Sequence, residues 1–356
     1  MHVPDGFIDA PVSVAAGAVA AGAVAVSLRG ARKELDERTA PLAGLVAAFI
    51  FAVQMLNFPV GAGTSGHLLG GALAAILVGP YTGVLCVAVV LLMQGLLFAD
   101  GGLTALGVNI TLMGVVTVVV SYAVFRVLIR VLPRGRGGLG VASFAAAAIS
   151  VPAAALAFTG LYAVGGTADV SLSKVATAMV GVHVLIGLGE AAITAVTVGS
   201  VAAVRPDLVH GARGLATPLQ IRHADGTTST VTAGGGREVP AAPRGSRKVW
   251  AAGLAAAVVL AGIVSFYASA DPDGLEKVAT DQGIAAKQQD HGLGDSPLAD
   301  YGVKDVGDAR LSGGLAGVIG VGVTLAAGSA VFVAVRRSNR GTSQAARAAS
   351  VPANRV

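Results

Sequence analysis

The class of fold is decided by LTALGVNITLMGVVTVVVSYAVFRVL, residues 103–128. This stretch holds one charged side chain, Arg126, and exceeds the roughly 20 apolar residues that an α-helix needs to cross a bilayer. It is therefore typical of a transmembrane helix.

The composition of the whole chain points the same way. Hydrophobic residues make up 54% of the 356 residues, charged residues 13%, and the mean hydropathy is +0.74. Because charged residues usually make up about a quarter of a soluble domain, so few charges could not solvate a globule of this size. The composition argues against a cytosolic enzyme, a secreted disulfide scaffold and a disordered chain. Cys86 has no second cysteine with which to form an internal disulfide.

Nine segments are long or apolar enough to be membrane spans, and the first seven are joined by short loops. The third is short and stops at Gly79-Pro80, which breaks a helix. The predicted spans are Phe7–Leu28, Pro41–Val60, His67–Val78, Tyr81–Phe98, Leu103–Leu128, Leu139–Leu161, Val175–Val204, Val249–Ala268 and Leu311–Val335.

The basic residues orient these spans. With the N-terminus outside and nine crossings, the Arg126–Arg136 cluster and most of the other basic residues fall on the cytoplasmic side, as the positive-inside rule requires. Omitting the short third span would place that cluster outside. Residues 1–9 are acidic, so the first span is not a cleavable signal peptide but stays in the mature chain. The outer side holds only Lys174, Lys277, Lys287, Lys304 and Arg310 of the 25 basic residues.

The chain divides into two membrane units. Residues 1–204 hold seven spans, and residues 205–247 form a Gly- and Thr-rich flexible cytoplasmic linker. Residues 248–340 form a helical hairpin around an acidic outer loop at 270–310, and residues 341–356 form a disordered tail. The acidic loop, with His291, either concentrates divalent cations outside or is a solvated spacer.

The extreme N-terminus, Met1-His2-Val3-Pro4-Asp5-Gly6, is a potential metal chelate. Methionine stays in place before a bulky residue, so the free α-amine, the His2 amide nitrogen and the imidazole Nδ1 can close two fused chelate rings. Three nitrogens in one plane suit Ni(II) or Cu(II). The alternative is that His2 is a polar residue at a frayed end.

A second histidine can complete this nitrogen plane. His67 follows the glycine-rich loop Gly61–Gly66, on the same outer side as Met1. Glycines let the backbone approach a ligand closely, so His67 can supply the fourth nitrogen. The alternative is an interfacial histidine at a helix start.

Both units contain long motifs. The first unit holds MHVPDGF at 1–7, NFPVGAGTSGHLLGG at 57–71, QGLLFADGGLTALGVNI at 94–110 and GVHVLIGLGEAAIT at 181–194, and the second holds DPDGLEKVAT at 271–280 and SPLADYGV at 296–303. Through these motifs the first unit resembles the substrate-binding component of nickel/cobalt energy-coupling-factor (ECF) transporters, of the CbiM/NikM type, and the second resembles the small NikN-like subunit with its PDGLE loop.

The resemblance carries a fold, a site and a mechanism. It implies an all-α integral membrane protein with a seven-helix bundle and a C-terminal two-helix hairpin, in a bacterial plasma membrane. It implies Ni(II) or Co(II) as the transported substrate, bound by Met1, His2 and His67, with no catalytic cofactor. It also implies a separate transmembrane coupling subunit and two ATPases. No G-x-x-x-x-G-K-[ST] phosphate loop is present, so we expect no ATP hydrolysis by this chain.

Other polar residues fall near the predicted site. Asp100, Gln94 and Asn109 could orient the metal ligands or could cap the loop and its helices, and Thr64 and Ser65 could donate hydrogen bonds within the histidine loop. His183 and Glu190 share one helical face as an intramembrane polar pair. A carboxylate within a span is costly and usually functional, and a polar clamp to another helix or a coupling role is favoured over metal binding.

Three functions compete. The first is the metal-capturing subunit of an ATP-driven nickel importer, and cobalt uptake for cobalamin synthesis is its near alternative. The second is a stand-alone ion-coupled metal transporter, for which Glu190 is nearly the only charged relay. The third, a membrane metalloenzyme, lacks a motif that pairs metal ligands with a general base. Planar nitrogen ligation favours Ni(II) over Co(II). Cu(II) would bind still more tightly, because it stands above Ni(II) in the intrinsic order of divalent metal affinities.

Overall fold

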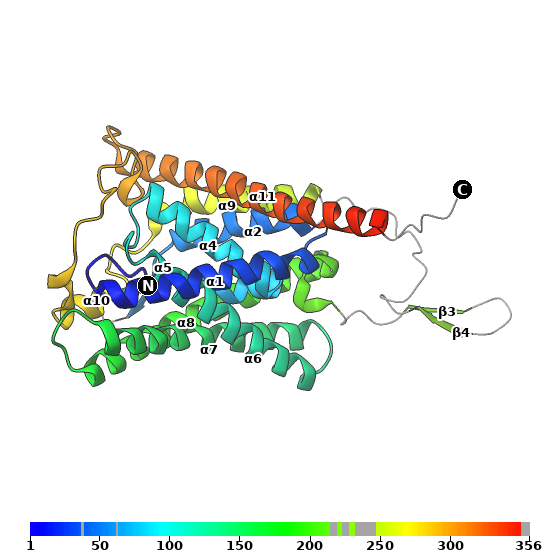
Figure 1. The fold of residues 1–356 in the computed structure, drawn as a ribbon, viewed down its shortest axis with the longest axis horizontal. Coiled ribbons are helices and arrows are strands. Elements are labelled where there is room, and N and C mark those ends of the chain that lie inside the picture. Colours follow the sequence, from blue (N-terminus) through cyan, green and yellow to red (C-terminus); the bar gives the residue numbers. More distant parts are fainter. Residues whose placement is uncertain (37–38, 62, 214–218, 223–227, 232–246, 350–356) are drawn as a thin grey trace.

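The protein is an elongated bundle of α-helices (Figure 1). The computed structural model describes residues 1–36, 39–61, 63–213, 219–222, 228–231 and 247–349. The helices are α1 (Ala10–Glu34), α2 (Thr39–Gln54), α3 (Gly71–Val78), α4 (Pro80–Leu97), α5 (Leu106–Asn109), α6 (Thr117–Val131), α7 (Arg136–Gly165), α8 (Leu172–Val204), α9 (Arg247–Gly262), α10 (Gly274–Asp281) and α11 (Ala309–Ala349).

Shorter elements join these helices. A π-helical turn, η1 (Ile110–Val116), joins α5 to α6 into one apolar rod, and five 3-10 turns are η2 (Pro206–Leu208), η3 (His210–Ala212), η4 (Val264–Tyr267), η5 (Ile284–Lys287) and η6 (Ala299–Tyr301). Two antiparallel hairpins are formed by β1 (Phe58–Gly61) with β2 (Thr64–Gly66), and by β3 (Leu219–Arg222) with β4 (Thr228–Val231).

Six helices of the described chain are long and apolar enough to cross a membrane. They correspond to the first, fourth, fifth, sixth, seventh and ninth predicted spans. The second and eighth spans are the shorter helices α2 and α9, each of 16 residues.

The third predicted span crosses the bundle in an unusual form. Its helix α3 has only eight residues, all of them buried. The chain before α3 starts at His67, which lies beside Met1. The chain after α3 reaches the far end of α1, where the Thr82 backbone N–H donates to Glu34 at 2.7 Å. Non-helical backbone is tolerated at membrane depth where protein buries it. The short span therefore connects the two ends of the bundle inside a sheath of longer helices.

The second unit packs on the first. Helix α11 lies along α2 and α9 (Figure 1), and Gly44 of α2 approaches Ser329 of α11 so closely that a Cβ would fall 2.4 Å from its hydroxyl. The loop after α9 returns to the end of the bundle that holds the N-terminus and α10 (Figure 1).

Two predicted boundaries differ from the structure. Within the predicted linker 205–247, η2 and η3 continue directly from α8, with Leu208 and Ala212 buried, and β3 pairs with β4. Much of the remaining linker lies outside the described residues. Helix α11 continues to Ala349, past residue 340, where the hairpin was predicted to end, because no Gly-Pro signal interrupts the helical stretch. Residues 350–356 of the predicted tail also lie outside the described chain.

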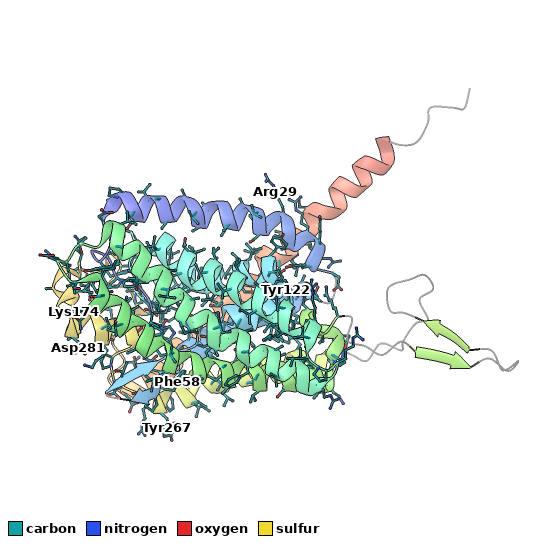
Figure 2. The ribbon with its side chains drawn as sticks, turned by 90° about the horizontal axis from the view of Figure 1, so that it is seen from below. Arg29, Phe58, Tyr122, Lys174, Tyr267 and Asp281 are labelled. Atoms are coloured by element: carbon teal, nitrogen blue, oxygen red, sulfur yellow. The ribbon has the colours of Figure 1, made fainter. Side chains whose placement is uncertain are left out.

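Charged side chains lie towards both ends of the bundle. Figure 2 shows Lys174 and Asp281 at the end that holds α10, and Arg29 towards the opposite end. Which of these ends faces the cytoplasm stays a prediction.

Close backbone contact between α1 and α5 generates a prediction about stability. A Cβ on Gly107 would fall 2.3 Å from the Cα of Gly17, whereas a Cβ on Gly17 points into open space. We expect Gly107→Ala to lower the free energy of unfolding by about 1–3 kcal/mol through overpacking. Gly17→Ala is the matched control and should be neutral or stabilising. Thermal unfolding in detergent measures both, and equal effects would contradict this contact.

Candidate metal centre

The N-terminal segment is threaded into the protein. Met1 is 2% exposed and Val3 is fully buried. The Val3 backbone N–H donates to the Asn109 side-chain oxygen at 2.7 Å, the Asn109 amide donates back to the Val3 carbonyl at 3.0 Å, and the Gly102 N–H donates to that same carbonyl. Because both polar groups of Val3 are satisfied, the amine of Met1 is held at a defined place.

A turn at Asp5-Gly6 secures this position. The Asp5 carboxylate accepts hydrogen bonds from the backbone of Leu103 and Thr104, at 3.1 and 2.8 Å. Gly6 has a φ of +90°, and a Cβ there would fall 2.2 Å from the Lys287 carbonyl oxygen. This position therefore favours glycine for its conformation and for the close approach of the second unit. The turn returns the chain to α1, whose N-terminus is capped by Asp9.

His67 lies directly against the amine. Its Nε2 is 2.6 Å from the Met1 nitrogen, and its ring is nearly buried. Its Nδ1 lies 3.1 Å from the Leu68 carbonyl oxygen, which can only accept, so Nδ1 carries the hydrogen and Nε2 keeps a lone pair. The β1–β2 hairpin therefore presents a ligand whose tautomer is already the one that binds metal.

Glu190 holds the backbone that follows His67. Its carboxylate accepts from the N–H groups of Leu69 and Gly70, at 2.6 and 3.2 Å, and the residue is fully buried in α8. His183, on the same face, instead donates from Nδ1 to the Met179 carbonyl of its own helix, at 2.7 Å. The two residues thus have different partners, and Glu190 clamps a loop rather than another helix.

His2 stacks on His67, with ring centroids 5.0 Å apart and planes inclined by 17°. Its Nε2 lies 3.2 Å from the Gln94 side-chain oxygen and its Nδ1 lies 3.3 Å from Asp100. Burial lowers the pKa of His2 to about 4, although Asp100 opposes the shift, so the neutral ring carries one hydrogen. When Nε2–H donates to Gln94, Nδ1 keeps the lone pair that a chelate needs.

An acidic residue of the second unit enters the same cluster. The Asp273 Oδ2 atom accepts from the Met1 ammonium at 2.8 Å and lies 3.5 Å from His67 Nε2. Burial alone would raise the pKa of Asp273, but the Met1 ammonium outweighs burial and holds this pKa well below its usual range. Asp273 is therefore ionised and balances the charge of the amine.

Sequence reasoning missed Asp273 and also Tyr301, whose hydroxyl donates to Asp100 at 2.6 Å. Both belong to motifs that the resemblance had singled out, DPDGLEKVAT and SPLADYGV. Membership of these motifs was the one sequence feature that pointed to Asp273 and Tyr301, because no periodic pattern links them to Met1. The acidic loop is thus docked on the histidine cluster. Two cavities of about 460 and 470 Å³ flank this cluster, and each is lined by His2, Asp100, Asp273 and Glu276.

The remaining predicted residues lie close to the cluster in different ways. Gln94 and Asp100 contact His2, and Asn109 contacts Val3. Thr64 and Ser65 are buried in β2, and the Ser65 hydroxyl donates to the Asp271 carbonyl of the second unit rather than within its own loop.

The donor atoms suit a metal ion. With metal–nitrogen bonds of about 2 Å, neighbouring nitrogens of a square plane lie about 2.8 Å apart, and the amine and His67 Nε2 are 2.6 Å apart. A search of the described residues for three or more His, Cys, Asp or Glu side chains that could hold a metal by themselves finds none. The donors that lie together here include the Met1 amine.

The fold and this cluster define a multi-pass membrane protein of the metal-transport class. The model of the family "Cobalt uptake substrate-specific transmembrane region" matches residues 2–208, and the PDGLE domain model matches residues 247–337. The chain belongs to this cobalt-uptake transmembrane family, with a PDGLE domain fused after it. The resemblance drawn from the motifs is confirmed, and so is the all-α membrane fold.

Two relatives and a solved structure are of the same class. The fused nickel transport protein NikMN of Rhodobacter capsulatus is 29% identical over 92% of this chain and 95% of its own. The cobalt transport protein CbiM of Sorangium cellulosum is 37% identical over 52% of this chain and 84% of its own. A crystal structure described as a truncated transition metal transporter has a TM-score of 0.50 and 26% identity, covering 57% of this chain and 99% of that one.

The clamp by Glu190 generates a prediction about metal affinity. Glu190→Ala leaves two buried backbone N–H groups without an acceptor, so the His67 loop should loosen and nickel affinity should fall by about 10–100-fold. Glu190→Gln keeps one acceptor and should lose less. The affinity is measured by competition with a chromophoric chelator.

Thr194→Val is the control for this test. It changes another buried polar group of α8, one turn away, whose hydroxyl has no hydrogen-bond partner among the described residues. Unaltered nickel affinity in Glu190→Ala would show that the loop after His67 keeps its conformation without the Glu190 carboxylate.

Proposed function

We propose that this protein is the metal-capturing subunit of an ATP-driven ECF-type importer that carries nickel. It binds Ni(II) at the outer face of the plasma membrane and delivers it inward with a separate transmembrane coupling subunit and two ATP-binding subunits. The N-terminus lies outside and the C-terminus in the cytoplasm.

The observation that carries this proposal is the 2.6 Å contact between the Met1 amine and His67 Nε2. Burying a charged terminus is costly even beside the Asp273 carboxylate, and an amine held against an imidazole nitrogen is well placed to bind a metal ion. The Met1 amine, the His2 amide and Nδ1, and His67 Nε2 together make four nitrogens in the plane that Ni(II) prefers.

Binding follows from proton release at these atoms. The metal replaces the proton that the amine shares with His67, and it displaces the amide proton of His2. The His2 Nδ1 lone pair turns from Asp100 to the ion, while Gln94 keeps the hydrogen on Nε2. Because ligands must be deprotonated, affinity rises with pH.

Cobalt is the second candidate. The matching family is described as a cobalt uptake region, and one relative is a cobalt transport protein, whereas a relative that matches 92% of the chain is a nickel transport protein. The fusion of both units, as in that relative, and the planar nitrogen set favour nickel.

Titration of an extended protein tests the amine. One extra residue before Met1 moves the amine away from His67, so we expect nickel and cobalt binding to be lost in competition titrations. The control is the same fusion cleaved to begin at Met1 itself, with thermal unfolding of both proteins to verify the fold. Undiminished affinity after extension would refute the amine's role.

Reconstituted vesicles test the partners. Nickel uptake should require the coupling subunit, both ATPases and ATP. Uptake by this chain alone, driven by an ion gradient, would support the stand-alone transporter instead.

A further inference from the structure

Three donor atoms already surround a point at which a metal ion can lie. The distances are 2.6 Å between the Met1 nitrogen and His67 Nε2, 2.8 Å between that nitrogen and Asp273 Oδ2, and 3.5 Å between Asp273 Oδ2 and His67 Nε2. A triangle with these sides has a circumscribed radius of about 1.8 Å, so one ion with bonds of about 2 Å can contact all three atoms. The third donor comes from the second unit.

The backbone around Asp273 is anchored to the hairpin that carries His67. The Ser65 N–H donates to the Pro272 carbonyl at 2.9 Å, and Ser65 forms a parallel bridge with Asp273. On the other side, a Cβ on Gly274 would fall 2.7 Å from both Ile186 and Val182 of α8. The backbone of Asp273 is therefore positioned by the hairpin before His67 on one side and by α8 on the other.

The two carboxylate oxygens of Asp273 have different hydrogen-bond partners. Oδ1 accepts from the Glu276 N–H at 2.8 Å and caps α10 in a capping box. Oδ2 faces the amine and His67, and no helix N–H competes for it. One oxygen thus anchors the side chain while the other is left for the cluster.

Charge also favours a carboxylate at this place. A dication bound by an amine, two imidazoles and one deprotonated amide keeps a net charge of about +1 in a site whose nitrogens are nearly buried. Uncompensated charge is costly there. Asp273, 17% exposed, makes the complex neutral.

We propose that Asp273 is a fifth metal ligand, through which the second unit completes the coordination sphere from above the nitrogen plane. This rests on the proposed metal-capturing function. In the metal-free protein, Asp273 holds the amine beside His67. On loading, the amine gives up its proton and Oδ2 transfers its contact to the ion. The PDGLE loop is then part of the binding site, and it encloses the ion between the two units.

A fifth ligand has a spectroscopic signature. Four-coordinate planar Ni(II) is diamagnetic, whereas an added axial oxygen makes it paramagnetic and raises the coordination number seen by X-ray absorption. The test uses the full-length protein loaded with nickel alone. We expect wild type to be paramagnetic and five-coordinate, with one oxygen in the first shell.

Asp273→Asn and Asp273→Ala then remove the ligand. We expect both variants to become planar and diamagnetic and to bind nickel at least about 10-fold more weakly. Asp271→Asn is the matched control, since it removes the same charge from the same loop, but its side chain is exposed and faces Ser269. It should leave the spectrum and the affinity unchanged.

The outcomes separate this inference from the proposed function. Wild-type protein that binds nickel in a planar, diamagnetic site overturns the role of Asp273 and leaves nickel capture standing, even if the variants fail to fold. Equal or tighter binding by Asp273→Asn overturns it as well. Absence of nickel binding to wild type, matched by His67→Ala, overturns the proposed function itself.

Discussion

The contact between the Met1 amine and His67 Nε2 is the interaction on which the arrangement of this end of the bundle depends, the end that holds α10. It joins the first residue of the chain to a loop 66 positions later, and both Met1 and His67 are buried. An ammonium is stable there only because Asp273 supplies a counter-charge. The N-terminal segment, the hairpin β1–β2 and the acidic loop are thus held together by a single group of polar atoms.

The long helices make this cluster possible by burying irregular backbone. The extended segment before α3 would expose its backbone polar groups to lipid if it lay on the surface. The eight-residue helix α3 is too short to cover these groups. The surrounding helices cover it, and Glu190 accepts from the N–H groups of Leu69 and Gly70. The buried Glu190 carboxylate in α8 is thereby explained, because it is the acceptor for backbone N–H groups of the loop after His67.

Several features of the site were predictable because they are local in the chain. Met1 and His2 are covalent neighbours, so their chelating geometry follows from bond lengths alone. Gln94, Asp100 and Asn109 flank one outer loop, and the structure places all three against the N-terminal segment. The partners of Ser65 and Glu190 were not predictable, since hydrogen bonds to backbone atoms leave no trace in the residue types they contact.

The sequence by itself determined the membrane class, the two units and the nitrogen-rich terminus, because hydropathy and covalent spacing act over short stretches of chain. Only the tertiary structure decided that Asp273, 272 residues from Met1, lies at its amine, and that Tyr301 reaches Asp100. Such contacts depend on how one unit packs against the other. Packing across that distance follows from the shapes of whole helices and loops, which no single stretch of residues encodes.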